Sequence, residues 1–117
     1  MIKCFVIDNQ PLIVKTFESY INKTPLFKLL GTARSYQAYA DQAVQADILL
    51  INTEIEPLSN EQLKLLRERS QVLILMAKAG NKPVYASNLN NEHEYPGYLE
   101  LPASYQVFLN EIGRLIK

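Results

Sequence analysis

Residues Ala46–Pro57, ADILLINTEIEP, contain the apolar run that decides the fold. Four apolar residues, Ile48 to Ile51, lead directly into Asn52, and a polar turn with a proline follows. A strand without polar positions is typical of a parallel sheet that helices cover on both faces. In such sheets the working groups lie at the carboxyl ends of the strands. The sequence therefore predicts a buried strand that presents the Asn52 amide at its tip.

Four further segments have the same apolar character and are expected to be strands. They are Ile2–Asp8, Phe27–Ala33, Gln71–Ala77 and Gly97–Leu101. Segments with helical signals separate them, so strand and helix alternate along the chain. Because crossovers between parallel strands are right-handed, this alternation predicts a doubly wound α/β sheet with helices on both faces.

Each expected helix has a start signal. Pro11 suits a first helical turn, and Ser35 and Ser104 can cap helices. Ser59 and Gln62 form a capping-box pattern before a run of leucines. The side chains expected on the apolar face of the first helix are Leu12, Ile13, Thr16, Phe17, Tyr20 and Ile21. Those of the second are Tyr36, Tyr39, Ala40 and Ala43, and those of the last are Tyr105, Phe108, Leu109, Ile112 and Ile116.

The segment between the fourth and fifth strands, residues 78–96, is the least regular part of the sequence. It contains two prolines, one glycine and four asparagines, all of which disfavour helix. A fourth helix in this segment is therefore expected to be short or irregular.

Composition limits the class of protein. The chain has 117 residues, 48% of them hydrophobic, so residues 1–117 are expected to form one domain with its own core. Twelve basic and twelve acidic residues give a formal net charge of zero, whereas nucleic-acid-binding domains carry a basic excess. We therefore expect no direct nucleic-acid binding. No apolar run has the length of a membrane span and no signal peptide is evident, so a soluble, cytoplasmic protein is expected.

Neither the only cysteine nor the only histidine has the surroundings of a reactive group. Cys4 lies inside the first apolar run, which predicts a buried, reduced thiol. His93 lies in NNEHEYP with no second metal ligand in view, so a solvated loop residue is expected. The sequence also lacks a nucleophile–base pair, and we do not expect an enzyme.

Four motifs, in order and across nearly the whole chain, resemble those of response-regulator receiver domains in two-component signalling. They are CFVIDNQPL, ADILLINTEIEP, VLILMAKA and GYLELPAS. The resemblance is strongest to receivers that precede LytTR-type DNA-binding domains. It implies a flavodoxin-like (CheY-like) fold with five parallel strands in the order 2-1-3-4-5.

The sequence departs from this family at the positions that carry its chemistry. Receivers have two adjacent acids after the first strand, and here these are Asp8 and Asn9. The phosphate-accepting aspartate falls at Asn52, the hydroxyl residue that senses the phosphoryl group at Met76, and the lysine at Leu101. The resemblance therefore implies a degenerate pseudo-receiver. We expect no phosphorylation at Asn52, only feeble magnesium binding and no cofactor, because a hard cation needs anionic oxygen ligands.

Two other receiver positions keep their character. Pro102 follows the lysine position, where the family's peptide bond is often cis. Tyr98 falls where receivers keep an aromatic residue that moves with activation.

The resulting hypothesis is a phosphorylation-independent signalling domain that acts by protein–protein interaction, either alone or as the N-terminal part of a response regulator. The alternative is a small flavodoxin-like ligand-binding domain. Against the alternative, the first strand is followed by DNQPL and not by a glycine-rich phosphate loop.

Receivers communicate through the fourth helix, fifth strand and fifth helix, which the resemblance places at about residues 82–117. Tyrosines are favoured at interfaces because they combine an apolar ring with a polar tip. The tyrosines of this segment are Tyr85, Tyr95, Tyr98 and Tyr105. We expect this face to bind a protein partner or a second copy of the chain, the other possibility being a monomer whose rings only cover the sheet.

Overall fold

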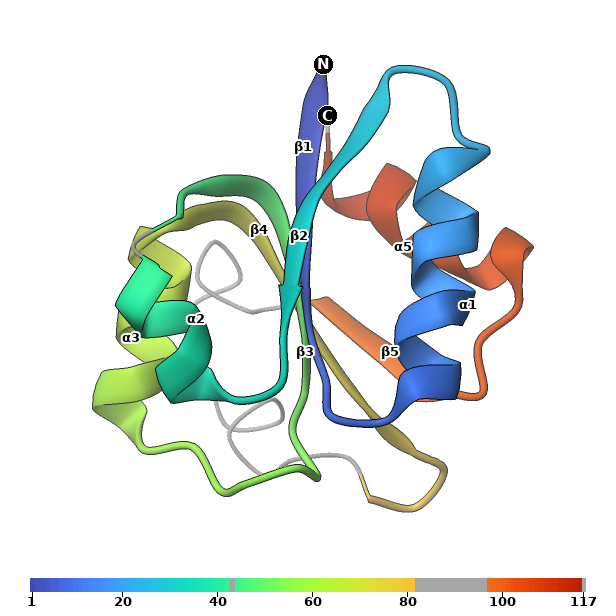
Figure 1. The fold of residues 1–117 in the computed structure, drawn as a ribbon. Coiled ribbons are helices and arrows are strands. Elements are labelled where there is room, and N and C mark those ends of the chain that lie inside the picture. Colours follow the sequence, from blue (N-terminus) through green and yellow to red (C-terminus); the bar gives the residue numbers. More distant parts are fainter. Residues whose placement is uncertain (43, 82–96, 117) are drawn as a thin grey trace.

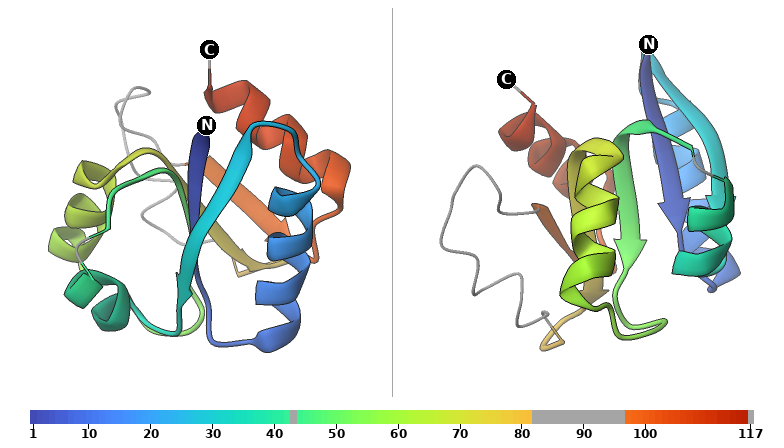
Figure 2. Two further views of the ribbon diagram at one scale, coloured as in Figure 1. Left: turned by 45° about the horizontal axis from the view of Figure 1, so that its top comes forward. Right: turned by 90° about the vertical axis from the view of Figure 1, so that its left-hand side faces the viewer.

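The computed structural model describes residues 1–42, 44–81 and 97–116. Its five parallel strands form one sheet in the order β2-β1-β3-β4-β5. Helices α1 and α5 cover one face of this sheet, and α2 and α3 cover the other (Figures 1 and 2). The predicted doubly wound fold is therefore confirmed, strand order included. The irregular fourth helix expected from the sequence lies outside the described residues.

The elements begin and end close to the expected residues. The strands are β1 (Ile2–Ile7), β2 (Phe27–Ala33), β3 (Ala46–Asn52), β4 (Ser70–Lys78) and β5 (Gly97–Leu101). The helices are α1 (Pro11–Asn22), α2 (Tyr36–Gln42), α3 (Asn60–Glu68) and α5 (Tyr105–Leu115). Strand β4 is one residue longer at each end than predicted. Within the described ranges, no helix has the length and apolar character needed to cross a membrane.

The central strands are buried because their side chains alternate between two apolar layers. In β3, Ile48 and Leu50 pack on the α1/α5 side, whereas Leu49 and Ile51 pack on the α2/α3 side. All four are inaccessible to solvent. Burying an apolar side chain of this size contributes about 1.5–3 kcal/mol, so the unbroken apolar run contributes strongly to the stability of the sheet.

The three serine caps form as predicted. In α3 the Ser59 Oγ accepts a hydrogen bond from the Gln62 backbone N–H at 3.1 Å, and the Gln62 Oε1 accepts one from the Ser59 N–H at 2.9 Å. The Ser35 Oγ accepts from the Ala38 N–H, and the Ser104 Oγ accepts from the Val107 N–H. Each cap satisfies a backbone donor that the first helical turn leaves unpaired.

Two expectations about helix faces were wrong. Leu12 is 81% exposed and Thr16 is also exposed, because the side of α1 that faces the sheet carries Ile13, Phe17, Tyr20 and Ile21 instead. Ile116 is not part of the last helix, because its backbone is extended and it forms the C-cap of α5.

Aromatic side chains join α1 to the start of α5. The ring of Tyr20 lies 5.4 Å from that of Tyr105 and 5.6 Å from that of Phe108, measured between centroids. The Tyr20 hydroxyl donates to the Ala103 carbonyl at 2.8 Å, and the Tyr105 hydroxyl is 2.8 Å from the Thr24 Oγ1. The first and last described helices are thus joined by both ring packing and hydrogen bonds.

Two glycines near the end of the chain provide a test of how closely α5 packs on the sheet. A Cβ at Gly97 would lie 2.4 Å from the Leu115 Cδ1 and 3.1 Å from the Ile74 Cγ1, whereas one at Gly113 would meet nothing within 4 Å. We expect Gly97→Ala to lower the free energy of unfolding by about 1–3 kcal/mol through overpacking. Gly113→Ala should raise it by about 0.5–1 kcal/mol, because alanine favours helix over glycine. Urea unfolding of both variants measures these changes, and a Gly97→Ala variant as stable as wild type would contradict the close packing.

Candidate functional site

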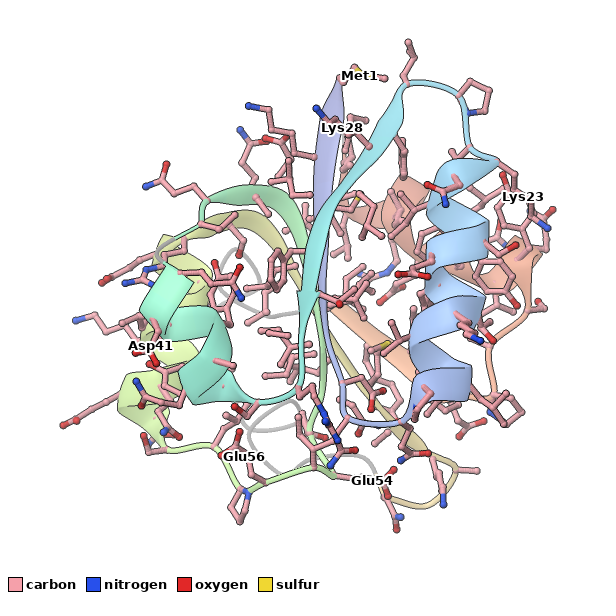
Figure 3. All side chains as sticks on the ribbon, viewed as in Figure 1. Met1, Lys23, Lys28, Asp41, Glu54 and Glu56 are labelled. Carbon is pink, nitrogen blue, oxygen red and sulfur yellow. The ribbon has the colours of Figure 1, made fainter. Side chains whose placement is uncertain are left out.

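The candidate site lies at the carboxyl ends of the central strands. Asp8 follows β1, and Asn52 is the last residue of β3; both side chains are buried, at 1% and 0% exposure. They are the only buried polar side chains in the described ranges. Met76 lies opposite Asn52 in the register between β3 and β4. The loop after β3 lies at the same end of the molecule and carries Glu54 and Glu56 (Figure 3).

Asp8 and Asn52 hydrogen-bond directly to each other. The Asn52 Nδ2 donates to the Asp8 Oδ2 at 3.1 Å, and the other carboxylate oxygen accepts the Gln10 backbone N–H at 3.0 Å. The Asn52 Oδ1 accepts the Glu54 backbone N–H at 2.9 Å. An amide supplies both N–H donors and a carbonyl acceptor from the same group, whereas an ionised carboxylate can only accept. This double requirement explains why asparagine fits the tip of β3.

The arrangement does not fit a divalent cation. Magnesium and calcium need several anionic or carbonyl oxygens, whereas this site has one carboxylate with two N–H groups directed at it. The part of the chain that the structure describes has no cluster of three or more histidine, cysteine, aspartate or glutamate side chains able to hold a metal. In the same ranges, no buried side-chain nitrogen or oxygen lacks a hydrogen-bond partner.

The other positions singled out from the sequence lie apart from this polar pair. Met76 and Leu101 are buried in the apolar layer on the α1/α5 side, where neither offers a hydrogen-bond donor or a positive charge. Asn9 is exposed. The peptide bond between Leu101 and Pro102 is cis. Of the five predicted positions, the structure thus joins only Asp8 and Asn52 by a hydrogen bond.

Sequence reasoning missed Glu54. This exposed side chain accepts hydrogen bonds from the Lys78 backbone N–H at 3.0 Å and from the Asn81 Nδ2. The Lys78 N–H, followed by the Asn81 amide, holds the pKa of Glu54 below its usual value. Glu54 lies two residues beyond the tip of β3, but no local pattern indicates that a backbone donor of β4 is its partner.

Tyr98 and Tyr105 lie on opposite faces of the sheet. Tyr98 packs against the layer on the α2/α3 side. Tyr105 packs against Tyr20 on the other side, and the Lys23 Nζ lies 4.2 Å from the centre of its ring. The rings of Tyr98 and Tyr105 therefore do not lie side by side. Tyr85 and Tyr95, the other tyrosines of the expected interaction face, lie outside the described residues.

Tyr98 also contacts neighbouring elements. Its backbone N–H donates to the Glu111 Oε2 at 2.7 Å, and its hydroxyl lies 3.5 Å from the Ala77 carbonyl oxygen. Burial raises the pKa of Tyr98, and the negative charges of Glu100 and Glu54 raise it further.

Cys4 has no reactive character. Its side chain is inaccessible to solvent. Burial, together with the charge of Asp47, raises the pKa of the thiol to about 12. The thiolate needed for nucleophilic attack is therefore nearly absent at neutral pH.

No protein-family model and no curated protein matches the sequence. The structure, in contrast, is similar to solved response-regulator receiver domains. RcsB from Salmonella enterica serovar Typhimurium, bound to promoter rprA in the presence of phosphomimetic BeF3-, has a TM-score of 0.78 and 10% identity over 100% of both chains. The response regulator domain of Thermotoga maritima CheB has a TM-score of 0.71 and 16% identity over 98% of this chain and 93% of that chain.

A third similar structure is the complex of the phosphorylated P1 domain of CheA3 with CheY6 from R. sphaeroides. It has a TM-score of 0.60 and 18% identity over 97% of this chain and 90% of that chain. At such identities the similarity shows a shared fold, so this chain has the receiver fold. Its chemistry has to be inferred from its own residues.

Replacing Asn52 with aspartate tests the role of the amide. The variant puts a second carboxylate beside Asp8, which removes a donor and adds repulsion between like charges. We expect Asn52→Asp to lower the free energy of unfolding by about 1–3 kcal/mol at pH 7. The deficit should shrink as the pH falls below about 5, because protonation of one carboxyl removes the repulsion.

The same substitution at the exposed Asn9 is the matched control and should change stability by less than about 0.5 kcal/mol. Urea unfolding of the wild type and the two variants, at pH 7 and at a pH below about 5, measures the differences in the free energy of unfolding. Equal stability of the wild type and Asn52→Asp at pH 7 would contradict the donor role of Asn52.

Proposed function

We propose that this chain is a receiver-like signalling domain that acts by protein–protein interaction and does not depend on phosphorylation. The observation that carries the proposal is the hydrogen bond between Asn52 and Asp8. It fills the tip of β3 with a neutral amide whose donor and acceptor are both engaged. The receiver fold supports the signalling role, because the similar solved structures are mostly signalling domains.

The surrounding residues support the loss of phosphoryl transfer. Acyl phosphate formation needs a carboxylate oxygen to attack phosphorus, and the amide of Asn52 is neutral and weakly nucleophilic. A transferred phosphoryl group also needs nearby positive charge and hydrogen-bond donors. At the corresponding positions Met76 and Leu101 are apolar and buried.

The alternative of a small-molecule-binding domain has less support. Ligand sites commonly present a few polar groups toward the ligand. Here every buried polar side-chain atom in the described ranges already has a partner within the chain. The association with a LytTR-type output domain and the cytoplasmic location remain predictions from the sequence.

Incubation with acetyl phosphate and magnesium tests the loss of phosphoryl transfer. We expect no phosphate-sized mass increase at Asn52 or Asp8. Asn52→Asp should also be labelled poorly, because neither Met76 nor Leu101 can stabilise the transferred group. Intact-mass spectrometry followed by peptide mapping gives the result. A base-labile phosphate on wild-type residue 8 or 52 would contradict the proposal.

The face formed by the expected fourth helix, β5 and α5 stays the proposed interaction face, and the outer side of α5 is the part of it that the described residues allow to be tested. Val107 is 47% exposed on this helix, and Gln106 and Asn110 beside it are also exposed. An exposed apolar side chain with neutral polar neighbours suits a protein interface. We propose that β5 and α5 bind a second copy of the chain or another protein, and that this binding does not depend on phosphorylation.

Replacing an exposed apolar side chain with a glutamate, at Val107 and separately at Leu12, tests this face. We expect wild type to form a concentration-dependent dimer in sedimentation velocity experiments, and Val107→Glu to shift it to monomer because a buried unpaired charge is unfavourable. Leu12→Glu, on α1, is the matched control and should leave the dimer intact. If wild type stays monomeric and a pull-down recovers no protein that Val107→Glu releases, the proposed face is wrong.

A further inference from the structure

The loop after β3 is joined to the end of β4 by four hydrogen bonds. The Thr53 backbone N–H and hydroxyl both donate to the Met76 carbonyl, at 2.9 and 3.2 Å. Glu54 makes the other two, with the Lys78 N–H and the Asn81 side chain. We name these last two contacts the Glu54 bridge.

The Glu54 bridge holds both ends of one tight turn. The Asn81 N–H donates to the Lys78 carbonyl at 3.0 Å, which closes the turn, and Gly80 takes the positive φ of 85° that this turn needs. One carboxylate oxygen binds the backbone of the turn's first residue, and the other binds the side chain of its last. Hydrogen bonds to an ionised carboxylate are stronger than those between neutral groups. The bridge therefore fixes how β4 ends.

The Glu54 bridge also continues the network of the buried pair. Asp8 accepts from the Gln10 N–H and from Asn52, and Asn52 accepts from the Glu54 N–H. A single series of hydrogen bonds thus runs from the start of α1, through the tips of β1 and β3, to the end of β4.

We propose that Glu54 is a positioning residue that transmits the arrangement of the Asp8–Asn52 pair to the end of β4. This deepens, and rests on, the proposed phosphorylation-independent function, because the negative charge that binds the β4 turn is built into the sequence. Asn52 orients the backbone of Glu54, and the carboxylate of Glu54 then sets the turn from Lys78 to Asn81. Tyr98 lies on the neighbouring strand, where the charge of Glu54 affects its hydroxyl.

Amide hydrogen exchange, measured residue by residue by NMR on the whole chain, tests the bridge itself. We expect the Lys78 amide to exchange about tenfold faster in Glu54→Ala than in wild type, because it loses a charged acceptor. The Thr53 amide, bonded to the Met76 carbonyl, should keep its rate. In Glu54→Gln the pKa of the Tyr98 hydroxyl should fall, because one of the negative charges that raise it is gone.

Glu56→Gln is the matched control, since Glu56 lies in the same loop but accepts the Tyr36 N–H at 2.7 Å instead. It should change exchange at Tyr36 and leave Lys78 and Tyr98 unaffected. A Lys78 amide that exchanges equally in wild type and Glu54→Ala would overturn the proposal.

Transmission from the buried pair is tested with Asn52→Ala. We expect faster exchange at Lys78 in this variant, and no further increase when it is combined with Glu54→Ala, because both changes break one series of bonds. Independent, additive effects would overturn the proposed transmission. Phosphate transfer is measured in a separate experiment, by mass spectrometry. Phosphorylation of Asn52 would refute the proposed function, and the exchange rates would still show independently whether Glu54 has the proposed role.

Discussion

The burial of β3 on both faces is the constraint on which the rest of the structure depends. The Asp8 and Asn52 side chains at the tip of this enclosed strand are buried, so their polar groups need partners from the protein. Asn52 meets this requirement by donating to Asp8 and accepting from the Glu54 backbone. The buried carboxylate of Asp8 is in turn satisfied by two N–H donors. The polar network at this edge of the sheet thus follows from the enclosure of its central strand.

The apolar neighbours are consistent with a pair that holds a single carboxylate. That carboxylate accepts two N–H donors, and residue 101 supplies no positive charge to it. Leu101 extends the apolar layer instead, together with Met76. The neutral amide at Asn52 and the apolar side chains of Met76 and Leu101 therefore form one physically consistent arrangement.

Much of the fold could be predicted from the sequence, because its signals are local. Apolar runs mark the strands, and Ser59 with Gln62 marks the start of α3. The candidate positions Asp8 and Asn52 could be found because strand ends meet at one edge of a parallel sheet. Features set by distant contacts could not be predicted: Tyr98 and Tyr105 pack on opposite faces, and Glu54 binds a backbone N–H of β4. The spacing and type of the residues do not indicate which face of the sheet an aromatic ring packs on. They also do not indicate which backbone N–H an exposed carboxylate accepts from.

The contacts around Asn52 also bear on the chemical ageing of the chain. Deamidation begins when the backbone nitrogen of the next residue attacks the asparagine side chain, and it would turn Asn52 into an aspartate. Here that nitrogen belongs to Thr53 and is engaged with the Met76 carbonyl, while both ends of the Asn52 amide are engaged elsewhere. The attacking and receiving groups are therefore both restrained within a buried strand end. The same hydrogen bonds that hold the site together therefore slow a spontaneous reaction that would place a second carboxylate beside Asp8.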